Sequence, residues 1–166
     1  MSEAAERSAW DSPGFLLWHV TLRWQRMVAT ALGPLGLTHV QFVLLAGAWW
    51  LARRGERPSQ RQLAEHTGTD PMMTSQVVRV LERRGLVRRE GDEADARVRR
   101  LAMTSEGEAL ALRAVGVVEA ADEGYFSAVP DREELVNLLR GLAGRKASVL
   151  TDGLCGYQPL MERGGR

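Results

Sequence analysis

The chain has 166 residues, 45% of them apolar, so its length and composition suit one ordinary domain with a buried core. No stretch is long and apolar enough to span a bilayer, the first 14 residues lack the hydrophobic run of a secretion signal, and the single cysteine excludes an internal disulfide. We therefore expect one domain over residues 1–166, no membrane partner, and a location in the cytoplasm of a bacterium.

The charged residues are unevenly distributed, although the net charge is only +1. Residues 53–100 contain 12 arginines and 8 acidic residues, whereas the rest of the chain contains more acidic than basic residues. A basic centre between acidic flanks is typical of a DNA-binding module inside a larger scaffold. Chance clustering on a solvated face explains the same charges, so charge alone does not decide between the two.

The first predicted helix begins at Ser12, an N-cap residue, with Pro13 at its first position. Apolar residues lie on most of its sides as far as Leu32, and a Gly-Pro pair ends it. Such a helix must be covered on more than one face. In so short a chain, we expect a second copy of the protein to supply that cover.

Three more helices are predicted: from Thr38 to about Gly55, from Ser59 to Gly68, and from Asp70 to Arg84. The first two begin with the spacing of a capping box, in which Gln41 or Gln62 follows three positions after a hydroxyl residue. The third begins with Asp70 and a proline, which is a common helix start.

A β-hairpin is predicted next, because residues 86–89 and 99–103 are short extended segments that flank a polar loop over residues 90–97. In a winged helix, such a hairpin lies along the DNA backbone and places an arginine in the minor groove. Arg97 fits that role, and Asp95, two residues earlier, is placed to hold it by a charge-assisted hydrogen bond.

Two helices complete the predicted order. The fifth begins at Thr104 or Ser105, where Ser105 and Glu108 have the capping-box spacing, and it is rich in small residues that permit close helix approach. The sixth begins at Asp131, and residues 153–166 are predicted to be a flexible tail. The fold class that follows is mainly α with a small β-hairpin wing, a winged helix-turn-helix with added helices.

Residues 59–84 match the plan of a helix-turn-helix, whose second helix enters the major groove. At about 100° per residue, one side of the second helix forms a core stripe: Thr74, Val77, Val78 and Leu81. The opposite side carries Met72, Ser75, Gln76, Arg79 and Arg83, with Met73 on the flank. Gln76 suits adenine, Arg79 suits guanine or a phosphate, and Met72 suits a thymine methyl group. A solvated amphipathic helix has a polar outer face as well, which is the alternative interpretation.

Four motifs occur in order along the chain: residues 63–71, residues 77–89, Asp95-x-Arg97, and the Leu101-x-x-Thr104-x-x-Gly107 pattern. With these motifs the sequence resembles the MarR family of bacterial winged-helix regulators, over roughly residues 12–150. The resemblance implies a homodimer that binds pseudo-palindromic operators in double-stranded DNA and commonly represses transcription. It also implies dimerisation helices over residues 12–36 and 105–150, around a DNA-binding region over residues 38–104.

By position, Asp95 and Arg97 fall on the wing pair of the family, and Ser75, Gln76 and Arg79 fall on its recognition helix. The chain departs from the family at Met72 and Met73, where small hydroxyl residues are common. This departure bears on which bases the helix prefers and not on how it docks on DNA. The candidate DNA-binding residues are Ser59, Met72, Met73, Ser75, Gln76, Arg79, Arg83, Arg88, Asp95, Arg97 and Arg99.

Many regulators of this family bind a small aromatic or acidic effector between the DNA-binding and dimerisation regions. Aromatic walls suit a planar ligand. The candidate effector residues on the first two helices are Trp18, His19, Trp24, His39, Trp49 and Trp50. A dimer core built from the same tryptophans is the favoured alternative.

No catalytic or metal-binding constellation emerges, because the three histidines lack neighbours at ligand spacing and no phosphate-binding loop or G-x-S-x-G motif occurs. We expect no enzyme activity, no cofactor and no metal. Cys155 lacks a partner cysteine, so redox sensing through it requires a disulfide between subunits.

A second functional hypothesis is a winged-helix module that binds proteins and not DNA. The acidic residues Asp92 and Glu93 of the hairpin loop motivate it, because they would repel phosphates at a contact.

Overall fold

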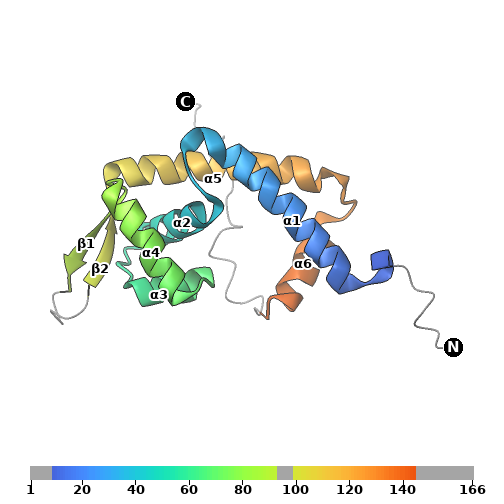
Figure 1. The fold of residues 1–166 in the computed structure, drawn as a ribbon, viewed down its shortest axis with the longest axis horizontal. Helices are drawn as coiled ribbons and strands as arrows, with labels where there is room; N and C mark the ends of the chain where they lie inside the picture. Colours follow the sequence, from blue (N-terminus) through green and yellow to red (C-terminus); the bar gives the residue numbers. More distant parts are fainter. Residues whose placement is uncertain (1–8, 93–98, 145–166) are drawn as a thin grey trace, which may run out of the picture. The chain divides into compact units, whose positions relative to one another are not determined.

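The structure, a computed structural model, describes residues 9–92 and 99–144 (Figure 1). It contains two units, the first ending at Tyr125 and the second beginning at Phe126. The predictions for Asp95, for Arg97 and for the tail with Cys155 lie outside the described residues.

The first unit is mostly helical. Its helices are α1 (Pro13–Leu32), α2 (His39–Arg53), α3 (Gln60–Thr67), α4 (Pro71–Arg83) and α5 (Ser105–Tyr125), with short 3-10 turns at Ala9–Asp11 and Gly33–Leu35. The strands β1 (Val87–Gly91) and β2 (Arg99–Met103) lie between α4 and α5. The second unit contains a 3-10 turn (Phe126–Ala128) and α6 (Arg132–Leu142). The predicted fold class, mainly α with a small hairpin, is confirmed.

The helix starts follow from local capping chemistry. The hydroxyl of Thr38 accepts from the backbone N–H of Gln41 (3.3 Å), whose side-chain oxygen accepts from the N–H of Thr38 (3.1 Å). The same reciprocal pair forms at the start of α3. At α5 the cap is Thr104, whose hydroxyl accepts from the N–H of Gly107 (3.0 Å). The expected capping box of Ser105 is therefore wrong, because Ser105 is already the first helical residue.

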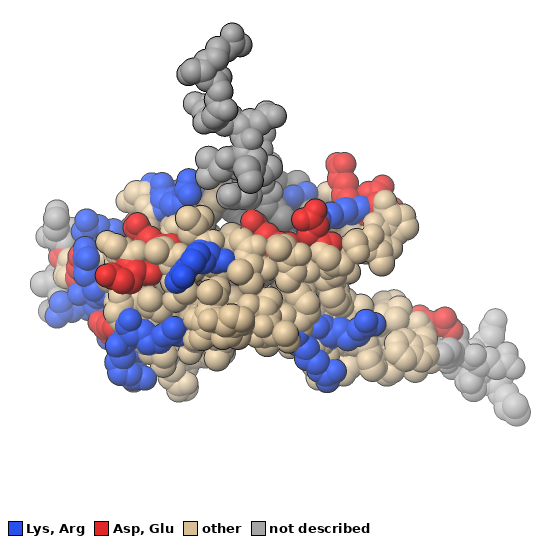
Figure 2. Space-filling view, turned by 90° about the horizontal axis from the view of Figure 1, so that it is seen from above, with Lys and Arg blue, Asp and Glu red and all other residues tan. Residues whose placement is uncertain are grey.

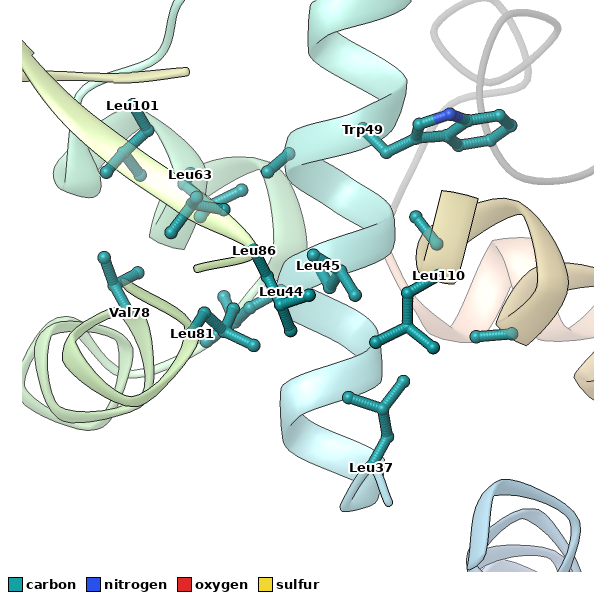
Figure 3. Packing of buried hydrophobic residues seen from close by; sticks show 14 of the residues in the cluster. Leu37, Leu44, Leu45, Trp49, Leu63, Val78, Leu81, Leu86, Leu101 and Leu110 are labelled. Carbon is teal, nitrogen blue, oxygen red and sulfur yellow. The ribbon is translucent and has the colours of Figure 1, made fainter. Parts of the chain in front are cut away.

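The core of the first unit surrounds α2, which supplies a continuous run of buried residues from Leu44 to Trp49. Figure 3 shows side chains from α3, α4, β2 and α5 converging on this helix. Leu44 and Leu45 have no exposed surface, and neither do Ala111 and Ala114, the small residues by which α5 packs. A single hydrophobic cluster therefore joins the helix-turn-helix and the hairpin to the helices α1 and α5.

Helix α1 is buried only near its end, at Val28 and Leu32. Its N-terminal half exposes Leu16, Leu17, Trp18 and Val20, and Trp18 is 62% exposed. The expectation that one chain cannot cover this helix agrees with that exposure.

No single helix among the described residues is long and apolar enough to cross a membrane. The segments Pro13–Leu35 and His39–Arg53 pass that test only when they are taken together, and they are bent by 74° at the break between them.

The hairpin is antiparallel, with Val87 opposite Met103 and Gly91 opposite Arg99. Ser59 forms a bridge with Arg100, and the N–H of Leu101 donates to the carbonyl of Pro58 (2.8 Å), so the chain before α3 extends the sheet. The first strand runs to Gly91, two residues beyond the predicted segment over residues 86–89, because Glu90 and Gly91 also pair with β2.

Helix α5 approaches the start of the hairpin so closely that only glycine fits at position 107. A β-carbon on Gly107 would overlap the carbonyl of Leu86, whereas one on Gly116, further along α5, would have no neighbour within 4 Å. We predict that Gly107→Ala lowers the free energy of unfolding by about 3 kcal/mol, measured by urea denaturation.

The matched control, Gly116→Ala, removes a helical glycine without a clash and should raise stability by about 0.5–1 kcal/mol. Equal stability changes for the two variants would show that the packing of α5 against Leu86 is not as tight as described.

Candidate nucleic-acid interface

The turn between α3 and α4 has a fixed geometry. Gly68 ends α3 in the left-handed conformation (φ 68°), which glycine adopts without strain. The hydroxyl of Thr69 lies 2.8 Å from that of Thr67 and 2.8 Å from that of Thr74, whose hydroxyl donates to the carbonyl of Asp70 (2.8 Å). Thr74 is completely buried. This chain of hydroxyls connects the end of α3 to the first turn of α4 and so sets the angle between the two helices.

Helix α4 has one buried and one exposed face. Thr74, Val78 and Leu81 are buried, as the core stripe predicts, and Val77 is half-buried. Of the residues predicted to contact DNA, Met72, Met73, Gln76, Arg79 and Arg83 are exposed, and Ser75 is half-buried. The back of the helix is therefore anchored in the core while its front is free to meet a partner.

Both ends of α4 are held by side chains. At its start, the carboxylate of Asp70 accepts from the N–H groups of Met72 and Met73, each at 2.9 Å. At its end, the guanidinium of Arg84 donates to the carbonyl of Gly36 (2.8 Å) and to the side-chain oxygen of Gln41 (3.3 Å). The first of these contacts links the end of α4 to the turn before α2, and the second links it to α2 itself. Sequence reasoning missed Arg84 because nothing local marks a partner more than 40 positions away.

The hydroxyl of Ser75 forms a hydrogen bond within the protein. With its amide oriented to suit both neighbours, Gln60 of α3 donates to the hydroxyl of Ser75 (3.3 Å) and accepts from Arg89 (2.8 and 3.0 Å). Arg89 also forms an ion pair with Glu82 (3.5 Å). This network joins α3, α4 and β1 behind the exposed face.

Carboxylates hold several arginines of the hairpin. Glu90 forms ion pairs with Arg88 (2.6 Å) and Arg57 (3.0 Å), and the hydrogen bond from Arg88 lowers the pKa of the Glu90 carboxyl. Arg88, a predicted DNA contact, is thus partly neutralised. Arg99, another predicted contact, is exposed and forms no ion pair within the described ranges.

Arg100 connects the hairpin to α3, and sequence reasoning did not select it. Its guanidinium forms an ion pair with Asp92 and donates to the side-chain oxygen of Gln62 (2.8 Å). Asp92 was expected to repel phosphates, but in the structure its carboxylate faces a guanidinium of its own chain. The predicted Ser59 begins the capping box that contains Gln62, and it is half-buried beside Arg100.

Figure 2 shows arginine side chains at the end of the first unit that carries the hairpin, with acidic side chains among them. The strands of the hairpin carry Arg88, Arg99 and Arg100, and Arg57 pairs with Glu90 of the same hairpin. Part of the basic centre predicted from the sequence therefore lies together on the hairpin, and intramolecular ion pairs offset part of its charge.

Five of the six residues predicted to bind an effector make ring contacts, in three separate places among the described residues. His19 lies against Phe15 and Trp10, Trp24 lies edge-on to His39 (5.0 Å), and Trp49 lies 6.4 Å from Trp50. Trp18 is exposed, and Trp49 is almost fully buried, with Arg53 over its ring. The structure thus does not join all six into one ring cluster.

The Trp24 and His39 pair lies beside acidic side chains of α5. The indole N–H of Trp24 donates to Asp122 of α5 (2.7 Å). Burial lowers the pKa of His39, and the nearby carboxylate of Asp122 offsets part of that effect. Burial and the charge of Asp122 raise the pKa of Glu119. Helices α1, α2 and α5 therefore meet at a mixed aromatic and acidic cluster.

A hollow of about 420 Å³ lies elsewhere, between the end of α2, α3 and β2. Its lining residues are Leu51, Glu56, Arg57, Pro58, Gln62, Glu65, His66 and Arg100. None of the six predicted effector residues is among them. No sequence pattern marks this hollow, whose wall comes from residues 51–66 except for Arg100, which joins it from β2.

A family model, related sequences and solved structures all match this chain. Residues 35–98 match a model described as MarR family. The chain is 42% identical over 131 residues to an uncharacterised HTH-type transcriptional regulator, YdcH of Bacillus subtilis, covering 79% of this chain and 87% of that protein.

Two solved structures are also similar. One is CouR from Rhodococcus jostii bound to p-coumaroyl-CoA, with 34% identity, a TM-score of 0.72, and 83% of this chain and 93% of that chain covered. The other is the Mycobacterium tuberculosis MarR family protein Rv2887 in complex with salicylic acid, with 32% identity, a TM-score of 0.63, and 83% and 98% covered.

The buried hydroxyl of Thr74 gives a test of the turn geometry. Thr74→Val keeps the shape of the side chain but removes the hydrogen bonds to Thr69 and to the carbonyl of Asp70, so stability should fall by about 1–2 kcal/mol. The control is Thr30→Val on α1, because the hydroxyl of the exposed Thr30 bonds, among the described residues, only the carbonyl of Arg26 in its own helix. Its effect should stay within about 0.5 kcal/mol. Thermal unfolding of both variants measures the difference, and a neutral Thr74→Val would contradict the role of the hydroxyl chain.

Proposed function

The chain belongs to the MarR family of helix-turn-helix transcriptional regulators, and we propose that it represses transcription as a homodimer bound to a pseudo-palindromic operator. Two copies of α4 occupy successive major grooves, about one helical turn of DNA apart. The hairpins lie on the flanking backbone, where Arg97 enters the minor groove and Asp95 holds it.

The observation that carries this proposal is the division of α4 into a buried back and an exposed front. Val78 and Leu81 are about 1% exposed, whereas Gln76, Arg79 and Arg83 are all exposed on the other side. Amide and guanidinium groups on a rigid helix are the groups that read base edges and bind phosphates. The alternative role as a protein-interaction module rests on Asp92 and Glu93; Asp92 forms an ion pair with Arg100, and Glu93 lies outside the described residues.

A homodimer is supported by the apolar side chains that a single chain leaves exposed. They are Leu16, Leu17, Trp18 and Val20 on α1, Leu112 and Val117 on α5, and Leu138, Leu139 and Leu142 on α6. On α1 alone, four of these side chains lie within residues 16–20, and exposed apolar patches of this kind mark protein contacts. Dimerisation through residues 12–36 and 105–150 would cover it, leaving residues 38–104 for DNA.

A small aromatic or acidic compound is the proposed effector that releases the DNA. One solved relative is bound to an aromatic thioester, p-coumaroyl-CoA, and the other to an aromatic acid, salicylic acid. In this chain the Trp24 and His39 rings, next to Asp122, are the support for an aromatic ligand at the junction of α1, α2 and α5. We further propose that the protein acts in the cytoplasm, without a cofactor and without catalytic activity, since its relatives are named as regulators.

Selection of bound duplexes from a random pool, followed by fluorescence anisotropy of the selected operator at several salt concentrations, tests the proposal. Affinity should fall steeply with salt, because arginines displace counterions from phosphates. In Arg79→Ala the affinity should fall, and if Arg79 binds phosphate, the salt slope should shrink by about 1 for each subunit.

The control is Arg113→Ala, which removes an exposed arginine of α5 and should leave the salt slope unchanged. Equal affinity for the selected operator and for random duplex at fixed salt would contradict sequence-specific binding.

A further inference from the structure

The exposed apolar side chains of the protein form two classes. Most lie on α1, α5 and α6, where the proposed dimer contact covers them. Within the described part of the chain from α2 to β2, the only exposed large apolar side chains are Met72 (73% exposed) and Met73 (37%). They stand on the first turn of α4, apart in sequence from the dimerisation helices, so dimerisation does not explain them.

The backbone at these two positions already has its hydrogen-bond partner. The carboxylate of Asp70 accepts from both N–H groups at 2.9 Å, and Pro71 has no N–H to offer. What the first turn of α4 presents outward is therefore the pair of thioether side chains. A thioether has no donor and is only a weak acceptor, so it is poorly suited to a phosphate or to the polar edge of a base.

Met72 begins the exposed stripe of α4. Gln76, Arg79 and Arg83 follow at positions four, seven and eleven residues later, so all lie on one face of the helix. The N-terminal residues of a recognition helix are those that contact base edges. In the major groove, the apolar group that a base pair presents is the C5-methyl of thymine.

Building on the proposed function, we propose that Met72 contacts the C5-methyl group of a thymine in each half-site, with the adjacent Met73 against the same edge. Gln76, one turn further along, reads a neighbouring A·T pair through the adenine. The polar contacts of Arg79 and Arg83 then bind the duplex, and the methionines decide at which base step α4 is placed. Met72 is on this basis a specificity-determining residue.

Replacing thymine by deoxyuridine tests the contact at a single group, because uracil keeps the base pair and both carbonyl acceptors but lacks the methyl. Thymines of the selected operator are replaced one symmetric pair at a time, and the dissociation constant is measured at fixed salt. For the unmodified protein, one such pair should lower affinity about four-fold for each half-site, as burial of one methyl group implies, and about fifteen-fold for both.

In Met72→Ala the same replacement should have little further effect, since the partner of the methyl group is gone. Met72→Leu, which keeps an apolar side chain of similar size, should retain the preference for thymine. Arg79→Ala is the matched control on the same face: it should weaken binding to the thymine and uracil duplexes by an equal factor. Circular dichroism checks the fold of each variant. Because Met72 is exposed, its substitution should leave the helical content unchanged.

An equal thymine preference in the unmodified protein and in Met72→Ala would overturn the inference, as would the absence of any thymine preference. In either case binding of the unmodified operator would still stand, so the proposed function would survive. Failure of the unmodified protein to bind any duplex would overturn the proposed function, and this inference with it.

Discussion

The burial of one face of α4 is the constraint on which the rest of the structure depends. Val78 and Leu81 are inserted into the cluster around α2, and the buried hydroxyl of Thr74 fixes the helix to the turn after α3. A helix held in this way cannot roll, because rolling would expose apolar surface and break the hydrogen bonds of a buried polar group. The direction of Gln76 and Arg79 is thus set by packing on the opposite side. The buried residues Thr74, Val78 and Leu81, which do not face a partner, therefore determine where the polar side chains of the exposed face lie.

Ion pairs determine how much positive charge the hairpin and its neighbouring segments present. Glu90, Asp92 and Glu82 hold arginines of the hairpin and of the segment before α3, whereas Arg79, Arg83 and Arg99 are exposed without such a pair among the described residues. Exposed ion pairs contribute little to stability. Their consequence here is that a basic region carries fewer available positive charges than its composition implies. Arg100, which joins Asp92 to Gln62, also connects the position of the hairpin to that of α3.

Much of the fold is predictable from the sequence because its signals are local. The capping pairs of Thr38 and Ser59 lie within four residues, and the stripe on α4 follows from helical periodicity alone. The pairing of Arg84 with Gly36, and of Arg100 with Asp92 and Gln62, depends on how distant segments pack, and a single sequence holds no record of that. The tryptophans illustrate the same limit: their positions on two helices were clear, but which rings would meet was not. Asp95 and Arg97 remain predictions, as do the roles of all the proposed DNA contacts.

Hydroxyl-radical footprinting of the selected operator tests the central claim most directly, because it reports where the backbone is covered without assuming which bases are read. Two rigid α4 helices on a symmetric dimer should protect two equivalent blocks whose centres lie about one helical turn, roughly 10 base pairs, apart. Protection of a single block, or a pattern without two-fold symmetry, would contradict the claim that paired α4 helices bind successive major grooves.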